Sequence, residues 1–145
     1  MRPDPHPRVL VADVRDAPLS VDEVVSAVRD EACGGLVTFI GIVRDHDHGK
    51  AVDGLGYSAH PSATEQLAAV CAGVAQGHST VRVGAVHRIG DLVVGDLAVV
   101  VAVAAPHRGE AFAACRELID TLKAEVPIWK HQVFADGADE WVGIA

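Results

Sequence analysis

Apolar residues recur along this chain at two spacings, one typical of strands and one typical of helices. Strands are expected where Val, Ile and Leu alternate or form short runs bounded by Gly, Pro or Asp, at 8–14, 35–44, 52–60, 80–90, 96–106, 128–134 and 140–145. Helices are expected where apolar residues recur every three or four positions, at 20–31, 63–77 and 109–125. We expect 35–44 to be mostly buried and to pair with 52–60 across a polar loop, and 80–90 to form a hairpin with 96–106.

Two S-x-x-E sequences mark the starts of the first two helices. Ser20 with Glu23, and Ser62 with Glu65, match capping boxes, in which the serine oxygen accepts a bond from a free backbone N–H of the first turn. Pro127 is expected to stop the last helix, because proline lacks the N–H that a helix interior needs. The spacing within that helix predicts a stripe facing the core, formed by Phe112, Cys115, Ile119 and Leu122.

The order of these elements predicts the fold class. Helices placed irregularly among strands that are mostly linked as hairpins favour an α+β sandwich over a doubly wound parallel sheet. Gly34 and Gly35 are expected to end the first helix. With 145 residues, half of them hydrophobic, the chain is expected to form a single domain over 1–145. Residues 1–7, which hold prolines and charges, are expected to be flexible.

The formal net charge of −8 limits the partners of the protein. An acidic surface repels nucleic acid and anionic membranes, so an anionic ligand would need a local cationic site. Three widely spaced cysteines without a C-x-x-C pair favour a reduced, cytoplasmic protein. The proline-rich start does not match a signal peptide, and the longest apolar run, 97–106, is too short to span a bilayer.

Cationic side chains stand at two places where an anion could bind. His107 and Arg108 leave an apolar strand and enter a helix start, where free N–H groups favour an anion; a solvated turn is the alternative. Lys123 and Lys130 are two of the three lysines in the chain. A lysine in the last helical turn commonly bonds terminal carbonyls, and one in a short strand can be a charge on a sheet edge.

The segment "VRDHDHGK", 43–50, is a third candidate. Arg44 follows an apolar strand, as Arg108 does, and sites often form at strand ends. Asp45, His46, Asp47 and His48 are metal-ligand types. Consecutive residues rarely converge on one ion and no spaced ligand pair supports them, so we expect no metal here but a mobile, exposed loop.

Several segments together resemble one family. "TFIGIVRDH" (38–46), "VHRIGDLVVGD" (86–96), "AAPHRGEAFAACRELIDTLKAEVPIWK" (104–130) and "DEWV" (139–142) are similar, in order and spacing, to the catalytic large subunits of molybdopterin synthase, the MoaE family. The similarity covers nearly the whole chain after about residue 30. It is carried by H-R-I-G, then H-R near a helix start, then L-K-x-x-x-P-x-W-K.

This resemblance implies a function and an assembly. Family members transfer sulfur to cyclic pyranopterin monophosphate (precursor Z) and so build the dithiolene of molybdopterin. The sulfur arrives as a thiocarboxylate on the C-terminal Gly-Gly of a small ubiquitin-like subunit, MoaD. The family fold is an α/β hammerhead, assembled as a large-subunit dimer with one small subunit at each end, a heterotetramer. No cofactor is implied.

The resemblance also assigns site residues. The substrate-binding residues of the family fall on Ile42, Val43, Arg44, His107, Arg108, Lys123, Lys130, His131 and Gln132. Arginines suit phosphate because their planar forks bond more than one oxygen, so we assign Arg44 and Arg108 to binding. Lys123 and Lys130 are expected to be catalytic. A lysine pKa begins near 10.4, and one cation about 7 Å away lowers it by only about 1.7 units, so a neutral amine needs further desolvation.

The chain departs from the family pattern at a few positions. "LGYSAHP" has Ser58 and His60 where an acidic and an aromatic residue are usual, and His131 and Gln132 replace a basic-acidic pair. The second change puts in doubt any acid-base role for a carboxylate near Gln132. These changes leave open a non-catalytic, anion-binding dimeric paralogue. An enzyme that uses a Schiff-base lysine is a further alternative, because that chemistry requires a lysine of depressed pKa in an apolar pocket.

The helix expected at 109–125 has a further consequence. Arg108 and Lys123 are 15 positions apart, and a continuous helix separates their backbones by about 22 Å. If both act on one pterin, they come from different protomers. We therefore expect a homodimer with shared active sites.

Overall fold

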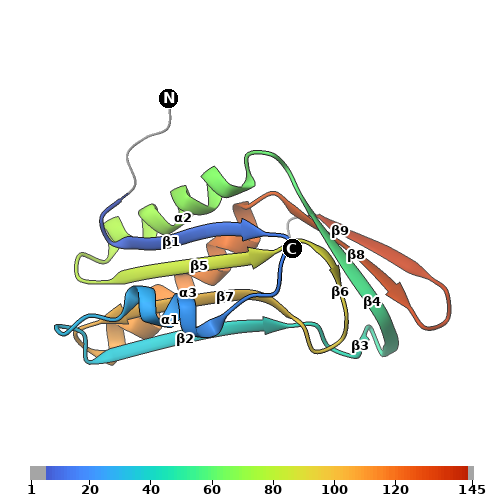
Figure 1. Ribbon diagram of the computed structural model, residues 1–145, viewed down its shortest axis with the longest axis horizontal. Helices are drawn as coiled ribbons and strands as arrows, with labels where there is room; N and C mark the ends of the chain where they lie inside the picture. The colour runs from blue at the N-terminus through green and yellow to red at the C-terminus, as the bar shows by residue number, and fades with distance from the viewer. Residues whose placement is uncertain (1–5, 144–145) are drawn as a thin grey trace.

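The computed structural model describes residues 6–143, so residues 1–5 of the expected flexible start and the last two residues of the expected strand 140–145 lie outside it. Three helices and nine strands occur within this range (Figure 1). In chain order they are β1 Val9–Arg15, α1 Val21–Val28, β2 Gly35–Ile42, β3 His46–Asp47, β4 Lys50–Ala59, α2 Ala63–Gly77, β5 Arg82–Arg88, β6 Gly90–Leu92, β7 Leu97–Ala105, α3 Arg108–Glu125, β8 Ile128–Phe134 and β9 Asp139–Gly143.

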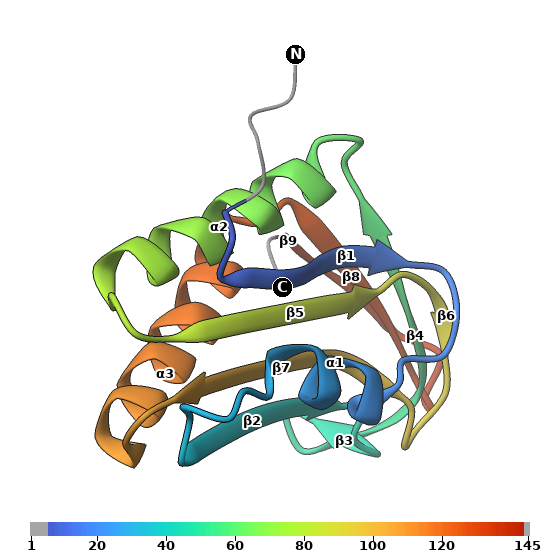
Figure 2. The same cartoon turned by 60° about the vertical axis from the view of Figure 1, so that its left-hand side comes forward.

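The strands form two sheets. The first has the order β1-β5-β7-β2, with β1 parallel to β5 and the other neighbours antiparallel. The second has the order β3-β4-β8-β9, is antiparallel throughout, and has β6 paired with β4. Figures 1 and 2 show α1 on one face of the first sheet, α2 and α3 on the other, and the second sheet beyond the strand ends. The expected α+β fold of mostly antiparallel strands is confirmed.

Strand β7 lies at the centre of the core because its side chains alternate between two apolar clusters. Val99, Val101 and Val103 belong to the cluster that includes α2 and α3. Val100 and Ala102 belong to the cluster beneath α1. A strand covered on both faces needs apolar residues at every position, which explains the continuous run at 97–105.

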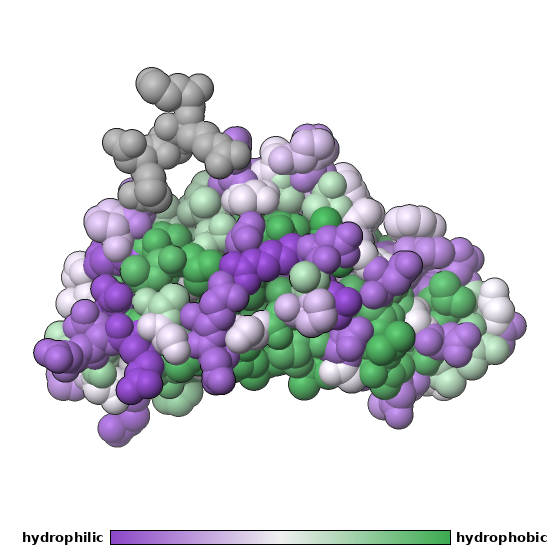
Figure 3. All heavy atoms as spheres, in the orientation of Figure 1, coloured by the Kyte–Doolittle hydropathy of each residue, from purple (hydrophilic) through white to green (hydrophobic). Residues whose placement is uncertain are grey.

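The expected pairing of 35–44 with 52–60 is wrong. Strand β2 pairs with β7, whereas β4 pairs with β8. The expected burial of 35–44 is also wrong, because β2 is an edge strand and none of its residues is fully buried. Leu36, Phe39 and Ile42 are 38%, 39% and 57% exposed. Apolar side chains accordingly reach the surface along this edge of the molecule (Figure 3).

The segment 45–53 is a hairpin and not the expected loop. His48 and Gly49 both have positive φ, 51° and 73°, as a two-residue type I′ turn requires. This turn joins β3 to β4 and pairs Asp47 with Lys50. Glycine or asparagine usually occupies such a position. A histidine there does not mark the turn in the sequence.

The helix boundaries agree with the sequence in part. Ser20 caps α1 by accepting a bond from the Glu23 N–H at 3.2 Å, as expected. Ser62 makes no such cap and accepts from the Gln66 side chain instead, so the second capping box is wrong. Helix α1 ends at Val28, before the two glycines.

Helix α3 agrees with the expected span to within one residue. Its buried stripe includes Cys115, Ile119 and Leu122, but Phe112 is 60% exposed and does not join it. Alanines fill the buried positions of the first turns instead, at 111 and 114. The prediction placed Phe112 in the core because phenylalanine is larger and more apolar than the neighbouring alanines.

Candidate functional site

A cavity of about 210 Å³ lies where the first sheet meets the second. It is lined by the end of β2, the start of β7, the C-terminal turn of α3, and the inner faces of β4 and β8. Six of the nine residues expected to bind substrate line it, namely Ile42, Val43, Arg44, Lys123, Lys130 and Gln132. The structure therefore gathers residues that are as far as 90 positions apart in the chain (42 to 132).

The two lysines reach the cavity from different elements. Lys123 is in the last turn of α3, and Lys130 is on β8. Strand β8 lies between β4 and β9. Lys130 is therefore not a charge on a sheet edge, which was the alternative explanation for this lysine. The neighbouring Trp129 is on the opposite face of β8, because side chains alternate along a strand. Their adjacency in the sequence therefore does not make Trp129 part of the cavity wall.

The surroundings of Lys123 disfavour its charge. Burial is the larger cause that lowers its pKa, and the positive charge of Lys130 is the second. By accessible area Lys123 still counts as an exposed residue, so water limits the effect of both causes. Lys123 therefore remains a cation that loses its proton more readily than an isolated lysine.

The cavity wall also holds a carboxylate, that of Asp47, which the sequence placed in a mobile loop. Its Oδ1 accepts a bond from the Arg44 guanidinium at 2.9 Å, and its Oδ2 accepts from the Gln132 amide at 2.7 Å. The same Gln132 nitrogen lies 3.1 Å from Oε1 of Glu140. The bond from Gln132 is the main cause that lowers the pKa of Asp47. Although position 132 itself is an amide, the structure thus places carboxylates directly beside it.

His87 is a second cavity residue that the sequence missed. It is 3% exposed, and its ring stands edge-on to Tyr57 with centroids 4.9 Å apart. Its Nδ1 lies 2.7 Å from the carbonyl oxygen of Arg88. A carbonyl only accepts, so Nδ1 carries the proton and Nε2 of the neutral ring keeps a lone pair. The available signal was the H-R-I-G sequence, which contributes to the family resemblance but to which no site role was assigned.

We expect His87 to make folding sensitive to mild acid. Burial, reinforced by Lys123, lowers its pKa from 6.5 to about 4, against the opposing effect of the bond to Arg88. The unfolded chain therefore binds a proton below pH 6.5 that the folded chain excludes, so stability falls by up to about 1.4 kcal/mol per pH unit between about pH 6.5 and 4.

The check is urea unfolding of the wild type and of His87→Gln at several pH values from 7.5 to 4.5. The wild type should lose stability over this window, and the variant should have a flatter profile whatever its stability at neutral pH. Equal slopes in the two proteins would assign the titration to another group.

His107 and Arg108 lie outside the cavity of a single chain. Both are exposed at the start of α3, and no side-chain bond caps this helix end. Helix α3 is continuous from Arg108 to Glu125, so its geometry separates Arg108 from Lys123 by about 22 Å. The structure thus confirms the helix on which the expectation of a shared site depends.

His131 also points away from the cavity. Its ring stacks on Trp141 with centroids 4.3 Å apart, and its Nε2 bonds Asp139 at 2.8 Å. His131 directly follows Lys130 on β8, and successive side chains of a strand point to opposite faces. His131 therefore lies on the outer face of the second sheet, as Trp129 does.

Among residues 6–143, one group of side chains has atoms close enough together to hold a metal ion. Ligand atoms of Asp47, His48 and Glu140 lie within 4.8 Å of one another. Gln132 donates to both carboxylates, and Arg44 donates to Asp47. Because these donors link the side chains to one another, we describe the group as a hydrogen-bond network.

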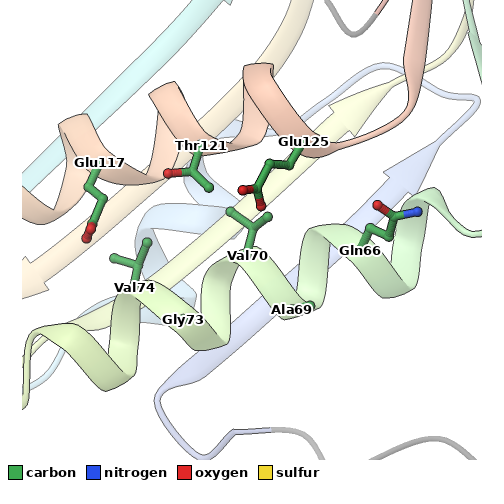
Figure 4. Close-up of a pocket in the computed structure, with 8 residues that line it drawn as sticks. All are labelled: Gln66, Ala69, Val70, Gly73, Val74, Glu117, Thr121 and Glu125. Carbon is green, nitrogen blue, oxygen red and sulfur yellow. The ribbon is translucent and has the colours of Figure 1, made fainter.

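A larger cavity of about 260 Å³ lies between α2 and α3 (Figure 4). Val70, Val74 and Gly73 form its apolar part, and Glu117 and Glu125 carry its negative charge. It has no lysine or arginine in its lining. Carboxylates without a cation repel an anionic substrate, so the smaller cavity is the candidate site.

Comparisons with known proteins show which proteins the chain resembles. A family model described as "MoaE protein" matches residues 14–125. The chain is 48% identical over 132 residues to "Molybdopterin synthase catalytic subunit 1" of Mycobacterium tuberculosis, covering 88% of this chain and 87% of that one. It is 45% identical over 130 residues to the molybdopterin synthase catalytic subunit of a Nostoc species, covering 88% and 79%.

Solved structures show the same fold. The crystal structure of molybdopterin synthase from Staphylococcus aureus matches with a TM-score of 0.84 at 32% identity, over 90% of this chain and 95% of that one. The MoaE protein of Burkholderia ambifaria matches with a TM-score of 0.80 at 31% identity, over 94% and 90%. In the part of the chain that the structure describes, no helix has the length and apolar character needed to cross a membrane.

Proposed function

This chain belongs to the MoaE protein family, and we propose that it is the catalytic subunit of a molybdopterin synthase. In this role it transfers sulfur from the C-terminal thiocarboxylate of a small, MoaD-like subunit to cyclic pyranopterin monophosphate. Its relatives from Mycobacterium tuberculosis and Nostoc carry the name of this catalytic subunit, and the residues of the cavity suit the chemistry.

One observation carries the proposal: three cations converge on one cavity in a protein with a net charge of −8. Arg44, Lys123 and Lys130 line it together. Both reactants are anionic, a cyclic phosphate and a thiocarboxylate, and an acidic exterior leaves this cavity as the attractive place for them. The attraction of anionic reactants explains why two of the three lysines of the chain line this cavity.

The side chains divide the work by their chemistry. Arg44 presents a planar guanidinium that suits the phosphate. Lys123 and Lys130 supply compact ammonium groups that can stabilise negative charge as it develops during sulfur transfer. The lowered pKa of Lys123 also makes its ammonium group a better proton donor than that of an ordinary lysine, since a weaker base gives up its proton more readily.

We further propose that the active site is completed by a second copy of this chain. His107 and Arg108 would join the cavity from the neighbouring protomer, as the length of α3 requires if Arg108 and Lys123 act on the same pterin. Phe39 on the edge strand β2 and Phe112 on the adjacent helix α3 are exposed, and they offer an apolar surface that a dimer could cover. This surface adjoins the cavity, since Phe39 is also in the lining.

A first test concerns the sulfur donor. We expect that removing the two C-terminal glycines of the small subunit abolishes sulfur transfer but only weakens its association with this chain. The tail carries the reactive group into the cavity, whereas docked globular surfaces supply most of the area of such an interface. Affinity is measured by calorimetry and transfer by dithiolene formation. Unchanged activity with the truncated subunit would refute this donor geometry.

The decisive experiment mixes the purified protein with thiocarboxylated small subunit and precursor Z and measures dithiolene formation. Product is expected at a rate that depends on both reactants. A folded, partner-bound sample that yields no product would favour the alternative, a non-catalytic dimer that retains the anion site. The changes at Ser58, His60, His131 and Gln132 raised this alternative, and the similarity to named catalytic subunits does not favour it.

A further inference from the structure

Asp47 occupies an unusual place for a carboxylate, in the wall of a cavity that otherwise gathers cations. It directly precedes the β3–β4 turn, whose backbone directs its side chain toward β8. The side chain is only 15% exposed. Arg44, Gln132 and the backbone N–H of His48 all donate to it, at 2.9, 2.7 and 3.0 Å.

We propose that Asp47 is a positioning residue, which holds the Arg44 guanidinium at the cavity and fixes it, through Gln132, to strand β8. The inference rests on the proposed function in one respect, namely that Arg44 binds the pterin phosphate.

Arg44 depends on this contact for its orientation. Its side chain is 69% exposed, and within residues 6–143 its one ion pair is with Asp47. A long, exposed side chain otherwise samples many rotamers, and ordering it on binding costs free energy. The pair uses one terminal nitrogen of the guanidinium and leaves the remaining donors for an anion.

Asp47 itself is held from the other side. Gln132 is 4% exposed, and its amide nitrogen bridges Asp47 and Glu140 at 2.7 and 3.1 Å. Gln132 is part of β8, two residues from Lys130. Asp47 therefore couples the orientation of Arg44 to the strand that carries a proposed catalytic lysine.

The negative charge of Asp47 has an opposing effect, because a carboxylate in the wall repels an anionic ligand. The two effects predict opposite results when the residue is replaced. If charge dominates, removing Asp47 tightens anion binding. If positioning dominates, removing it weakens binding. We expect the second result, because the Arg44 guanidinium, 2.9 Å from the carboxylate, already offsets its charge.

The experiment measures steady-state kinetics with the small subunit and direct binding of precursor Z by calorimetry. Asp47→Ala should raise both KM and Kd for the precursor by about fivefold, the upper end for a partly exposed ion pair, with a smaller change in kcat. Asp47→Asn keeps an acceptor for Arg44 and should show a smaller rise. Asp45→Asn is the matched control, because Asp45 lies in the same segment but bonds His46 and is absent from the cavity lining.

A double-mutant cycle separates positioning from a general structural role. In an Arg44→Ala background, Asp47→Ala should have no further effect on KM or Kd, because the group that it orients is gone. Equal effects in both backgrounds, or tighter binding by Asp47→Ala and Asp47→Asn alike, would overturn the inference. If the alanine variant melts at a lower temperature than the wild type, the change in KM and Kd is judged from the isosteric Asp47→Asn variant. A wild type that neither binds nor converts precursor Z would instead contradict the proposed function.

Discussion

Replacing either Lys123 or Lys130 with alanine should reduce sulfur transfer by about 10²- to 10³-fold, the usual loss when one preorganised charge-stabilising donor is removed from an active site. Both side chains line the same cavity, and both reactants of the proposed sulfur transfer are anions. The effect should appear mainly in kcat, because the negative charge that the ammonium groups stabilise grows toward the transition state.

The fold should survive these substitutions. Lys123 is exposed in the last turn of α3, and the backbone of Lys130 is paired on both sides, with β4 and β9. The third lysine, Lys50, is the matched control. It pairs with Asp136 at 2.9 Å and lies over the Phe134 ring, away from the cavity lining. Lys50→Ala should therefore retain near-normal turnover.

Circular dichroism and thermal melting establish that each variant is folded, and dithiolene formation measures its activity. If Lys123→Ala or Lys130→Ala turns over at nearly the wild-type rate, that lysine is only a charge on a helix end or strand.

Mixing two inactive variants, Arg108→Ala and Lys123→Ala, should restore activity to roughly a quarter of wild type, if each active site combines the two residues from different protomers. After joint unfolding and refolding, about half of the dimers are mixed. Each mixed dimer has one intact site and one doubly defective site, so half of the dimers contribute half of their sites.

The continuous α3 is the structural basis of this expectation. It spans Arg108–Glu125 without interruption, so the two side chains of one protomer cannot meet on a small pterin across about 22 Å. Arg108 is exposed at the helix start, and its replacement should leave the fold intact.

A matched control uses two lysine variants. Lys123 and Lys130 line the cavity of the same chain, so a mixture of Lys123→Ala with Lys130→Ala has a defective lysine at every site and should stay inactive. Subunit exchange is verified with a mass-tagged protomer. If exchange occurs and the arginine–lysine mixture stays inactive, the site lies within one chain.

The sequence determined the local structure well, for a physical reason. Strand 128–134 and helix 63–77 have the expected bounds, and α1 begins with the expected serine cap. Such features depend on interactions between residues close in the chain, such as a hydroxyl with the N–H three residues on. The failures also have local causes, such as a turn that uses His48 at positive φ.

The sequence also determined the distance between Arg108 and Lys123, because the rise per residue fixes the length of a helix. It indicated the candidate residues through the resemblance to MoaE proteins. Six of these residues line one cavity in the structure, and His107, Arg108 and His131 do not. Asp47 and His87 were missed as cavity residues because their chemistry depends on neighbours far away in the chain.

Only the tertiary structure decided which strands pair and what the cavity contains. Apolar alternation shows that a strand has a buried face, but many strands could cover that face equally well. Pairing β4 with β8, and not with β2, left β2 at an edge with its apolar residues exposed. The same pairing placed Gln132 within reach of Asp47, 85 positions away. Such contacts form only when separate elements are brought together, so no local pattern in the sequence records them.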